Sequence, residues 1–340
     1  MKYLLPPVKQ YFKSALHVHT TVSDGRMTPE EVKAAYKERG FQIVAYTDHE
    51  VCIPHPELAD EDFLPLTGYE ASFQNPEDEK FLRKTYHLCF IAKEPDSRWQ
   101  VFDDTLAIGN NKQYVDQVIC DGFERRRYSL EQVNDAIARA NAHGFLASYN
   151  HPTWSLQNYS DYAGLKGLWG MEVYNNHCLR VGFDDNNSRV YQDLLTLGNL
   201  ICPLATDDFH RLETPDWMGG GWVMIGAEKL EYGSIIRAME AGDVYASTGP
   251  EIHSLTLDGT TLKFSCSDAQ SVLFFTHSRH AKEFKAEKGT FLQNGEFDLT
   301  PWLDYWKEHN QQDKAFIRMV VIGPDGSRAY TRAYWYHELV

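Results

Sequence analysis

The sequence predicts an α/β main domain followed by a small antiparallel β domain, and three observations support this prediction. Over residues 1–250, short apolar runs alternate with helical patterns of about 10–15 residues. Most of these apolar runs end in His, Asp or Glu. After residue 250 the pattern changes to the period-two alternation typical of half-buried strands. Alternating strands and helices predict parallel βα units, hence a barrel or an open α/β sheet.

Residues 28–40 have the ends expected of a helix in the main domain. Thr28 is the N-cap residue, and Glu31 completes a capping box. Residues 129–144 repeat this pattern with Ser129 as the cap. Further helices are predicted over 188–197 and 234–241, and strands over 41–50, 63–73, 84–92, 145–152, 167–175 and 200–210.

Residues 251–340 are the predicted second domain. Apolar residues alternate over 252–267, where Asp258 and Gly259 provide a hairpin turn. We expect an antiparallel β-sandwich of about 90 residues. Residues 94–127 lack clear periodicity, and we expect them to form a long excursion over one end of the main domain, where long loops are often functional.

The charge balance limits the partners of the chain. The sequence has 33 Lys and Arg against 48 Asp and Glu, a net charge of −15, which argues against binding extended nucleic acid through a basic surface. A small anionic substrate is compatible with this charge, because bound divalent ions would reverse the local potential. No apolar run approaches the roughly 20 residues that cross a bilayer, and the first ten residues do not resemble a signal peptide. We therefore expect no membrane partner.

Six cysteines are scattered through the chain without a C-x-x-C pair. Several lie inside apolar runs, which favours buried reduced thiols over disulfides. This pattern predicts a cytoplasmic location.

Residues 15–25, "ALHVHTTVSDG", place His17 and His19 two positions apart at the end of an apolar run. Side chains at i and i+2 of a strand point to the same face, so both imidazoles can reach one point in space. This arrangement offers two ligands to one metal ion.

Other predicted strands also end in side chains that bind metals. In parallel α/β folds, chemistry collects at the carboxyl ends of the strands. Taken singly, each residue has a simpler explanation: Asp48 can cap a loop, and His151 can be a loop histidine. Taken together they predict a metal site. The residues concerned are His17, His19, Asp24, Asp48, His49, Glu70, His87, His151, Glu172, Asn175, His177, Asp208 and His210.

Six motifs stand in one order along the chain: "HVHTTVSDG", "YTDHE", "GYE", "YHL", "NHP" and "DDFH". In this order they resemble the PHP (polymerase and histidinol phosphatase) domain family over about residues 14–250. The resemblance implies a distorted (β/α)7 barrel with two or three metal ions at the carboxyl ends of its strands. The small β domain resembles the tail of some stand-alone members.

The resemblance also implies roles for individual residues. Glu70 would be a bridging carboxylate, and Asp208 would share a metal with His17 and His19. Nitrogen and oxygen ligands of this kind suit Zn²⁺, Mn²⁺ or Fe²⁺. The implied metal ligands are His17, His19, Asp24, His49, Glu70, His87, His151, Asp208 and His210.

The chain departs from the family pattern in three places. Glu50 follows "TDH", where many relatives have a smaller polar residue. The doubled aspartate of "DDFH" makes Asp207 a candidate partner of a ligand or an additional ligand. Residues 95–128 match no pattern.

The chemistry predicted for such a site is hydrolysis. Two ions about 3.5–4 Å apart can hold a bridging hydroxide that attacks phosphorus, with Asp208 among the residues that carry the reaction. His177 and Asp207 are the candidates for the general acid. Arg26 and Arg180 are candidates for binding the phosphate, although each can also be a solvated surface arginine. The "MGGGW" stretch lacks the residues of a phosphate loop and is expected to be a flexible turn.

Three functions remain open at this point. The first is a phosphoesterase acting on a small molecule or a nucleotide. The second is a hydrolase of a carbamate, amide or ester, since no clear phosphate-binding motif is present. The third is a non-catalytic, metal-stabilised protein whose aromatic β domain ("WLDYW", "YTRAYWY") binds a carbohydrate or a partner. The sequence leaves open whether the β domain forms a homodimer.

Overall fold

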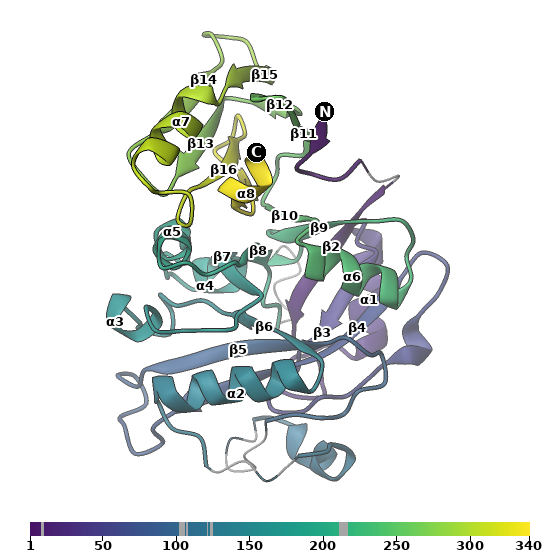
Figure 1. The fold of residues 1–340 in the computed structure, drawn as a ribbon. Coiled ribbons are helices and arrows are strands. Elements are labelled where there is room, and N and C mark those ends of the chain that lie inside the picture. Colours follow the sequence, from purple (N-terminus) through teal and green to yellow (C-terminus); the bar gives the residue numbers. More distant parts are fainter. Residues whose placement is uncertain (8–9, 102–105, 107, 121, 123–124, 211–216) are drawn as a thin grey trace.

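The structure is a computed structural model of the 340-residue chain. It describes residues 1–7, 10–101, 106, 108–120, 122, 125–210 and 217–340. A large mixed sheet forms the body of the molecule, and a second sheet of four strands covers its far end (Figure 1). The strand order of the large sheet is β14-β13-β16-β17-β10-β9-β2-β3-β4-β5-β6-β7-β8, with β18 beside β16.

The main part of the chain alternates strands and helices as the sequence predicts. Its strands are β2 (Gln10–Val18), β3 (Ile43–Tyr46), β4 (Leu64–Gln74), β5 (Thr85–Ala92), β6 (Phe145–Tyr149), β7 (Gly170–Asn175), β8 (Cys202–Thr206), β9 (Trp222–Ala227) and β10 (Val244–Ser247). Its helices are α1 (Pro29–Glu38), α2 (Leu130–Ala142), α3 (Tyr159–Tyr162), α4 (Asn176–Arg180), α5 (Ser188–Thr196) and α6 (Tyr232–Ala241), with short 3₁₀ helices η1 (Pro56–Leu58) and η3 (Asn111–Gln117).

The predicted helix ends are confirmed for α1 and α2. The Thr28 hydroxyl accepts a hydrogen bond from the backbone N–H of Glu31 at 3.3 Å, and the Glu31 carboxylate accepts one from the N–H of Thr28 at 2.8 Å. The Ser129 hydroxyl caps α2 by accepting a hydrogen bond from the backbone N–H of Gln132 at 3.5 Å. α6 ends at Gly242, which adopts a left-handed conformation with a φ of 73°. The local sequence therefore determines where these helices begin and end.

The prediction of parallel strands is correct for two parts of the sheet and wrong for β5. β2, β3 and β4 are parallel, and so are β6, β7 and β8. β5, however, runs antiparallel to both of its neighbours. The link between β4 and β5 has no crossover helix, and only such a crossover can bring the next strand back in parallel. The start of β5 therefore lies beside the carboxyl ends of its neighbours. The fold class is therefore mixed α/β, with one large sheet.

The strands after residue 250 are antiparallel, as predicted. They are β11 (Ile252–Asp258), β12 (Thr261–Ala269), β13 (Ser271–Thr276), β14 (Ala281–Lys285), β15 (Leu292–Asp298), β16 (Phe316–Ile322), β17 (Arg328–Thr331) and β18 (Tyr334–Trp335), with helices α7 (Thr300–Glu308) and α8 (Tyr336–Leu339). The "WLDYW" stretch lies in α7, a helix that the sequence analysis did not predict; its Trp306 is fully buried in the core between the two sheets.

Two pairings connect this region with the rest of the chain. β1 (Lys2–Tyr3) pairs with β11, and β10 pairs with β17, so the large sheet continues from the main part into the C-terminal strands. We call residues 251–340 together with β1 the C-terminal lobe. Figure 1 places both chain ends on this lobe. No helix among the described residues is long and apolar enough to span a membrane.

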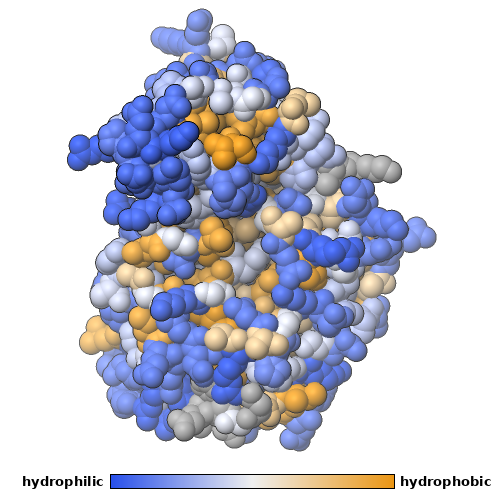
Figure 2. All heavy atoms as spheres, in the orientation of Figure 1, coloured by the Kyte–Doolittle hydropathy of each residue, from blue (hydrophilic) through white to orange (hydrophobic). Residues whose placement is uncertain are grey.

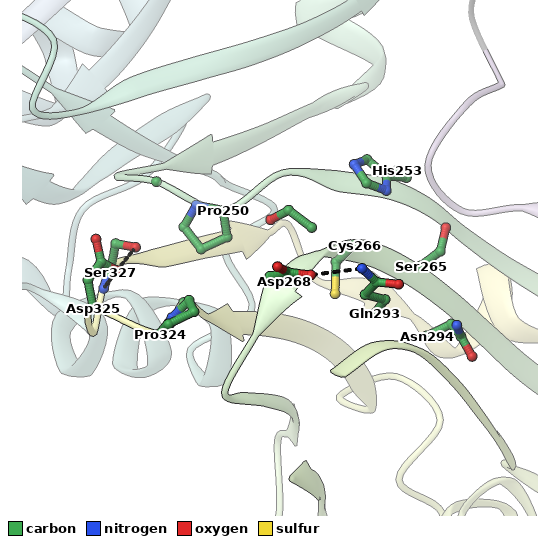
Figure 3. Close-up of a pocket in the computed structure, with 13 residues that line it drawn as sticks. Pro250, His253, Ser265, Cys266, Asp268, Gln293, Asn294, Pro324, Asp325 and Ser327 are labelled. Atoms are coloured by element: carbon green, nitrogen blue, oxygen red, sulfur yellow. Dashed lines mark hydrogen bonds between the residues drawn. The ribbon is translucent and has the colours of Figure 1, made fainter. Parts of the chain in front are cut away.

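The C-terminal lobe also carries an open hollow of about 850 Å³ (Figure 3). Polar side chains line much of it, and Gln293 donates a hydrogen bond to Asp268 across it at 2.8 Å. None of its lining residues belongs to the histidine-rich group of the main part, so the hollow is separate from the site described below.

Thr28→Ala should lower the free energy of unfolding by about 1 kcal/mol, because it removes the hydroxyl that caps α1. Urea denaturation followed by circular dichroism measures this change. Thr28→Ser retains the hydroxyl and should unfold close to wild type. Equal destabilisation by both variants would contradict the capping role.

Candidate metal centre

The two histidines at the end of β2 converge on one carboxylate. The Nε2 atoms of His17 and His19 are 3.0 Å apart, and each lies 3.2 Å from Oδ1 of Asp208. Asp208 follows β8, and its backbone N–H donates to the carbonyl oxygen of His17 at 3.0 Å. All three side chains are buried. The structure thus brings together the three residues expected to share a metal.

Glu70, in β4, lies at the centre of the histidine group. Its Oε1 is 3.1 Å from Nδ1 of His87 and 3.3 Å from Nε2 of both His17 and His151. Its Oε2 is 3.1 Å from Nδ1 of His49. The antiparallel direction of β5 makes this possible, because it places His87, near the start of β5, beside Ser72 in the second half of β4.

A third set of donors surrounds Asp24. Its carboxylate lies 3.5 Å from Nε2 of His210 and 3.9 Å from ring nitrogens of both His19 and His49. The rings of His19 and His210 stack with their centroids 4.0 Å apart. His19 and His49 therefore each belong to two sets of donors, and the nine predicted ligands form one continuous group that is buried except for the half-buried Asp24 and His210.

The donor atoms fit divalent metal ions. Atoms about 2.1 Å from one ion lie about 3.0–3.4 Å from one another in octahedral or tetrahedral geometry, and most of the separations above lie in or near that range. Nδ1 of His19, Nδ1 of His49 and Oδ1 of Asp208 are buried without a hydrogen-bond partner among the described residues. Buried polar atoms normally have partners, so these three are suited to bind ions.

Glu172 is a further member of the site that the sequence analysis noticed at a strand end without giving it a role. Its Oε1 accepts a hydrogen bond from Nδ1 of His17 at 2.7 Å and one from the hydroxyl of Thr206 at 2.7 Å. Its Oε2 accepts one from the backbone N–H of His151 at 2.9 Å. Glu172 therefore orients the ring of His17 and directs Nε2 toward the centre of the group.

Cys89 is a second residue that the sequence analysis missed. It pairs with Glu70 across β4 and β5 and belongs to a donor set with His17 and Glu70. Asn150 donates to Sγ of Cys89 at 3.1 Å and to Glu70 at 2.9 Å. Burial raises the pKa of the Cys89 thiol to about 11. The period-two rule identifies it, since His87 and Cys89 share one face of β5.

Asp207 is turned toward a different set of partners. Its carboxylate accepts hydrogen bonds from the backbone N–H groups of Gly219, Gly220 and Gly221 at 2.6–3.2 Å and from the hydroxyl of Tyr36 at 3.0 Å. Burial raises its pKa to about 6. The "MGGGW" stretch is thus a turn whose N–H groups surround Asp207.

Asp48 also lies outside the donor sets. Its carboxylate accepts hydrogen bonds from the backbone N–H and the hydroxyl of both Thr20 and Ser23, at 2.7–3.1 Å. It fixes the loop between His19 and Asp24, which is the capping role considered for it.

The predicted acid and the predicted cations lie at the edge of the group or beyond it. His177, in α4, is half-buried, and its ring centroid is 5.0 Å from that of His210. Arg26 donates its backbone N–H to the carbonyl oxygen of His210 at 2.9 Å, but its side chain is exposed. Arg180, the last residue of α4, is also exposed.

One exposed aromatic side chain borders the group. Trp154 is 36 % exposed, and its ring contacts those of His87 and His151 at centroid distances of 5.4 and 5.1 Å. In Figure 2, hydrophobic atoms gather over the part of the surface where α3 and α4 lie. The exposed apolar residues of this stretch are Trp154, Leu156, Tyr159, Val181 and Phe183.

The buried charges shift the pKa values of the group in opposite directions. Burial lowers the pKa of His19, but the adjacent carboxylates of Asp208 and Glu70 outweigh burial and raise the pKa to about 10. The pKa of His151 rises to about 9 because the bond to Glu70 likewise outweighs burial. Burial and the neighbouring His19 lower the pKa of His49 to about 3. Part of the group therefore binds protons tightly, and part remains neutral.

The chain matches the PHP domain family over residues 15–197, which is more than half of its length. The chain therefore belongs to the PHP domain family, as its motifs indicated. A comparison with curated proteins gives no match.

Three solved structures are similar to the chain. A two-domain protein from Bacteroides vulgatus containing a predicted PHP-like metal-dependent phosphoesterase has 15% identity and a TM-score of 0.45, over 98% of each chain. A protein from Bifidobacterium adolescentis provisionally assigned as a metal-dependent phosphoesterase has 17% identity and a TM-score of 0.39, over 58% of this chain and 87% of its own. An amidohydrolase from Chromobacterium violaceum, with bound sulfate and no metal, has 18% identity and a TM-score of 0.40, over 68% and 96%.

Metal binding should tighten as the pH rises from about 6 to about 9. In the metal-free protein, His19 and His151, with pKa values of about 10 and about 9, carry protons that a metal ion must displace. Less competition from protons at higher pH then raises the affinity. Calorimetric titration with Mn²⁺ in buffers of different ionisation enthalpy measures both the affinity and the protons released. An affinity that does not change with pH would contradict this assignment.

Glu172→Gln should weaken metal binding by about 10- to 100-fold, because the amide cannot replace the charged partner of the His17 ring. Equilibrium dialysis followed by elemental analysis measures the change. Glu251→Gln, an exposed residue outside the group, is the control and should bind like wild type. Wild-type affinity in Glu172→Gln would mean that Glu172 does not orient His17.

Proposed function

We propose that the protein is a metal-dependent hydrolase whose substrate is a phosphate ester of a small molecule or a nucleotide. The observation that carries this proposal is the convergence of nine donors, seven of them buried and Asp24 and His210 half-buried, into overlapping sets. His17, His19, His49 and Glu70 each belong to more than one set. Shared donors support the binding of two or three ions close together. His17, His19 and Asp208 would hold one ion, with Glu70 beside them, and the sets around His49 and Asp24 would hold the others.

Zn²⁺, Mn²⁺ or Fe²⁺ bound by these residues would supply the Lewis acidity that activates water and polarises the ester. The protein's own residues orient the ligands and move the proton. Glu172 holds the ring of His17, and Asn150 holds the carboxylate of Glu70. We assign the general acid to His177, because it lies beside His210 at the edge of the group. Asp207 is less suited to that role, since its carboxylate is surrounded by the glycine turn and Tyr36.

We also propose that the main strands close into the predicted distorted barrel. Support comes from the segment after β8, where Phe209 forms a parallel bridge with Val18 at the end of β2. Hydrogen bonds from Asp208 to His17 and from His19 to Phe209 accompany this bridge. A cytoplasmic location remains part of the proposal, supported by the buried thiols of Cys52, Cys89, Cys178, Cys202 and Cys266.

Hydrolysis of a carbamate, amide or carboxylic ester is the second candidate, and one observation favours it. Among the described residues, no ion pair joins a Lys or Arg to Asp24, Glu70 or Asp208, and the side chains of Arg26 and Arg180 are exposed. A phosphate dianion usually requires such cations, whereas a neutral carbonyl substrate does not.

The deciding experiment is an assay of the Mn²⁺-, Zn²⁺- and Fe²⁺-loaded protein on three panels: phosphate monoesters, phosphate diesters, and carbonyl esters with carbamates. We expect turnover of a phosphate ester that falls at least about 100-fold in His151→Ala. His253→Ala, which changes an exposed histidine of the C-terminal lobe, is the matched control and should retain activity. Turnover confined to the carbonyl panel would replace the first function by the second. No turnover with metals bound would favour a non-catalytic binding protein.

A further inference from the structure

The stretch between β5 and α2 contacts the segments that carry two of the metal ligands. Its described residues include Trp99–Val101, 108–120 and 125–127. Several of them form hydrogen bonds with backbone atoms of His49 and the residues after it, or of the loop that carries Asp24. The residues that make contacts with these segments are Gln100, Gly109, Asn110, Asn111 and Arg126.

Asn111 holds the backbone of His49 itself. Its side chain is only 1 % exposed, and Nδ2 donates to the carbonyl oxygen of His49 at 2.7 Å. Its Oδ1 accepts from the backbone N–H of Ile108 at 2.9 Å, which fixes the orientation of the amide. Both polar ends of this buried side chain are therefore satisfied, one of them by the metal-ligand segment.

Gln100 holds the backbone of Glu50 and Cys52, which follow His49 in the chain. Its Nε2 donates to the carbonyl oxygen of Glu50 at 2.6 Å, and its Oε1 accepts from the N–H of Cys52 at 2.7 Å. The side chain is fully buried. A second contact, from the backbone N–H of Gln100 to the carbonyl oxygen of Ile119 at 3.0 Å, ties it to the rest of the excursion. The amide thus satisfies the carbonyl oxygen of Glu50 and the N–H of Cys52, two backbone groups of buried residues.

Glu50 shows why this segment needs support. Its φ of 64° is in the left-handed region, which costs a non-glycine residue about 1–3 kcal/mol. Its N–H donates to the carbonyl oxygen of Glu70 at 2.8 Å, and its carboxylate accepts from the N–H of Ser72 at 2.8 Å and pairs with Arg126. This strained residue comes directly after His49, whose backbone forms a parallel bridge with Glu70.

The same excursion fixes the Asp24 loop. Asn110 donates its backbone N–H to the carbonyl oxygen of Ser23 at 2.8 Å. Its side-chain Nδ2 donates to the carbonyl oxygen of Thr21 at 3.2 Å. Gly109 lies so close that a Cβ there would be 2.2 Å from the oxygen of Ser23. His49 and Asp24 form one donor set, so both sides of that set are held by one stretch of chain.

We propose that Asn111 and Gln100 are positioning residues for metal binding. They hold the His49 segment so that Nδ1 faces Glu70 and Nε2 faces Asp24. This inference rests on the metal centre of the proposed function. It makes a selective prediction: loss of either amide weakens the ions held by His49 and leaves the set of His17, His19 and Asp208 intact. The described side chains of Gln100 and Asn111 form their hydrogen bonds with other residues, not with that set.

The test is metal titration of Asn111→Ala and Gln100→Ala, using Mn²⁺ followed by electron paramagnetic resonance, with elemental analysis of the dialysed protein. We expect at least one site to weaken about tenfold or more while another keeps wild-type affinity. Gln113→Ala is the matched control, since Gln113 lies in the same 3₁₀ helix with an exposed side chain. It should bind like wild type.

Asn111→Asp separates positioning from general destabilisation. It keeps the side-chain volume and the acceptor for Ile108 but cannot donate to His49, and its added negative charge by itself would favour cation binding. Weaker binding in this variant, with an unfolding temperature in EDTA close to that of Gln113→Ala, supports positioning. Wild-type or tighter binding in both Asn111 variants overturns it, as does uniform weakening of every site.

The outcome for wild type separates this inference from the proposed function. If wild type binds metal but hydrolyses no ester, the proposed reaction fails while the positioning of His49 stands or falls on the variants alone. If wild type binds no metal, both fail together. If wild type binds metal and hydrolyses substrate but the Asn111 variants bind equally well, only the positioning inference fails.

Discussion

The structure depends on one buried carboxylate among histidine rings. Glu70 is 1 % exposed and lies within 3.4 Å of ring nitrogens of His17, His19, His49, His87 and His151. A buried charge costs several kcal/mol unless opposite charges or ions compensate it. The histidine charges provide that compensation, and hold the pKa of Glu70 well below its usual range against the effect of burial. The same contacts bring the ends of strands from both halves of the main sheet to one point.

Much of this arrangement could be predicted from the sequence, because it follows short-range rules. Thr28 and Glu31 are three residues apart, and their capping box depends only on local geometry. His17 and His19 share a face because strand side chains alternate. The order of the six motifs then extended the prediction from these local pairs to the PHP domain family, and the family match over residues 15–197 confirms that family.

The remainder depends on contacts between distant segments, and no local pattern encodes those. The antiparallel direction of β5 is determined by the connection before it, and the apolar run of β5 does not by itself indicate the direction of the strand. Glu172 acts through His17, 155 residues away in the chain. The glycine turn donates backbone N–H groups to Asp207, and the amides of Gln100 and Asn111 bind backbone atoms near His49. Only the fold reveals these pairs, because backbone groups are the same in every residue.

The pairing of β1 with β11 has a consequence for the order in which the protein forms. Lys2 and Tyr3 pair with Leu257 and Thr256, so β1 cannot pair until the strands of the main part, which lie between these segments in the chain, have been synthesised. Long-range pairing of this kind is slow, since its loop-closure entropy must be overcome before the contact stabilises anything. During synthesis the metal-ligand strands can therefore assemble before the C-terminal lobe folds, and the pairing of β1 with β11 forms late.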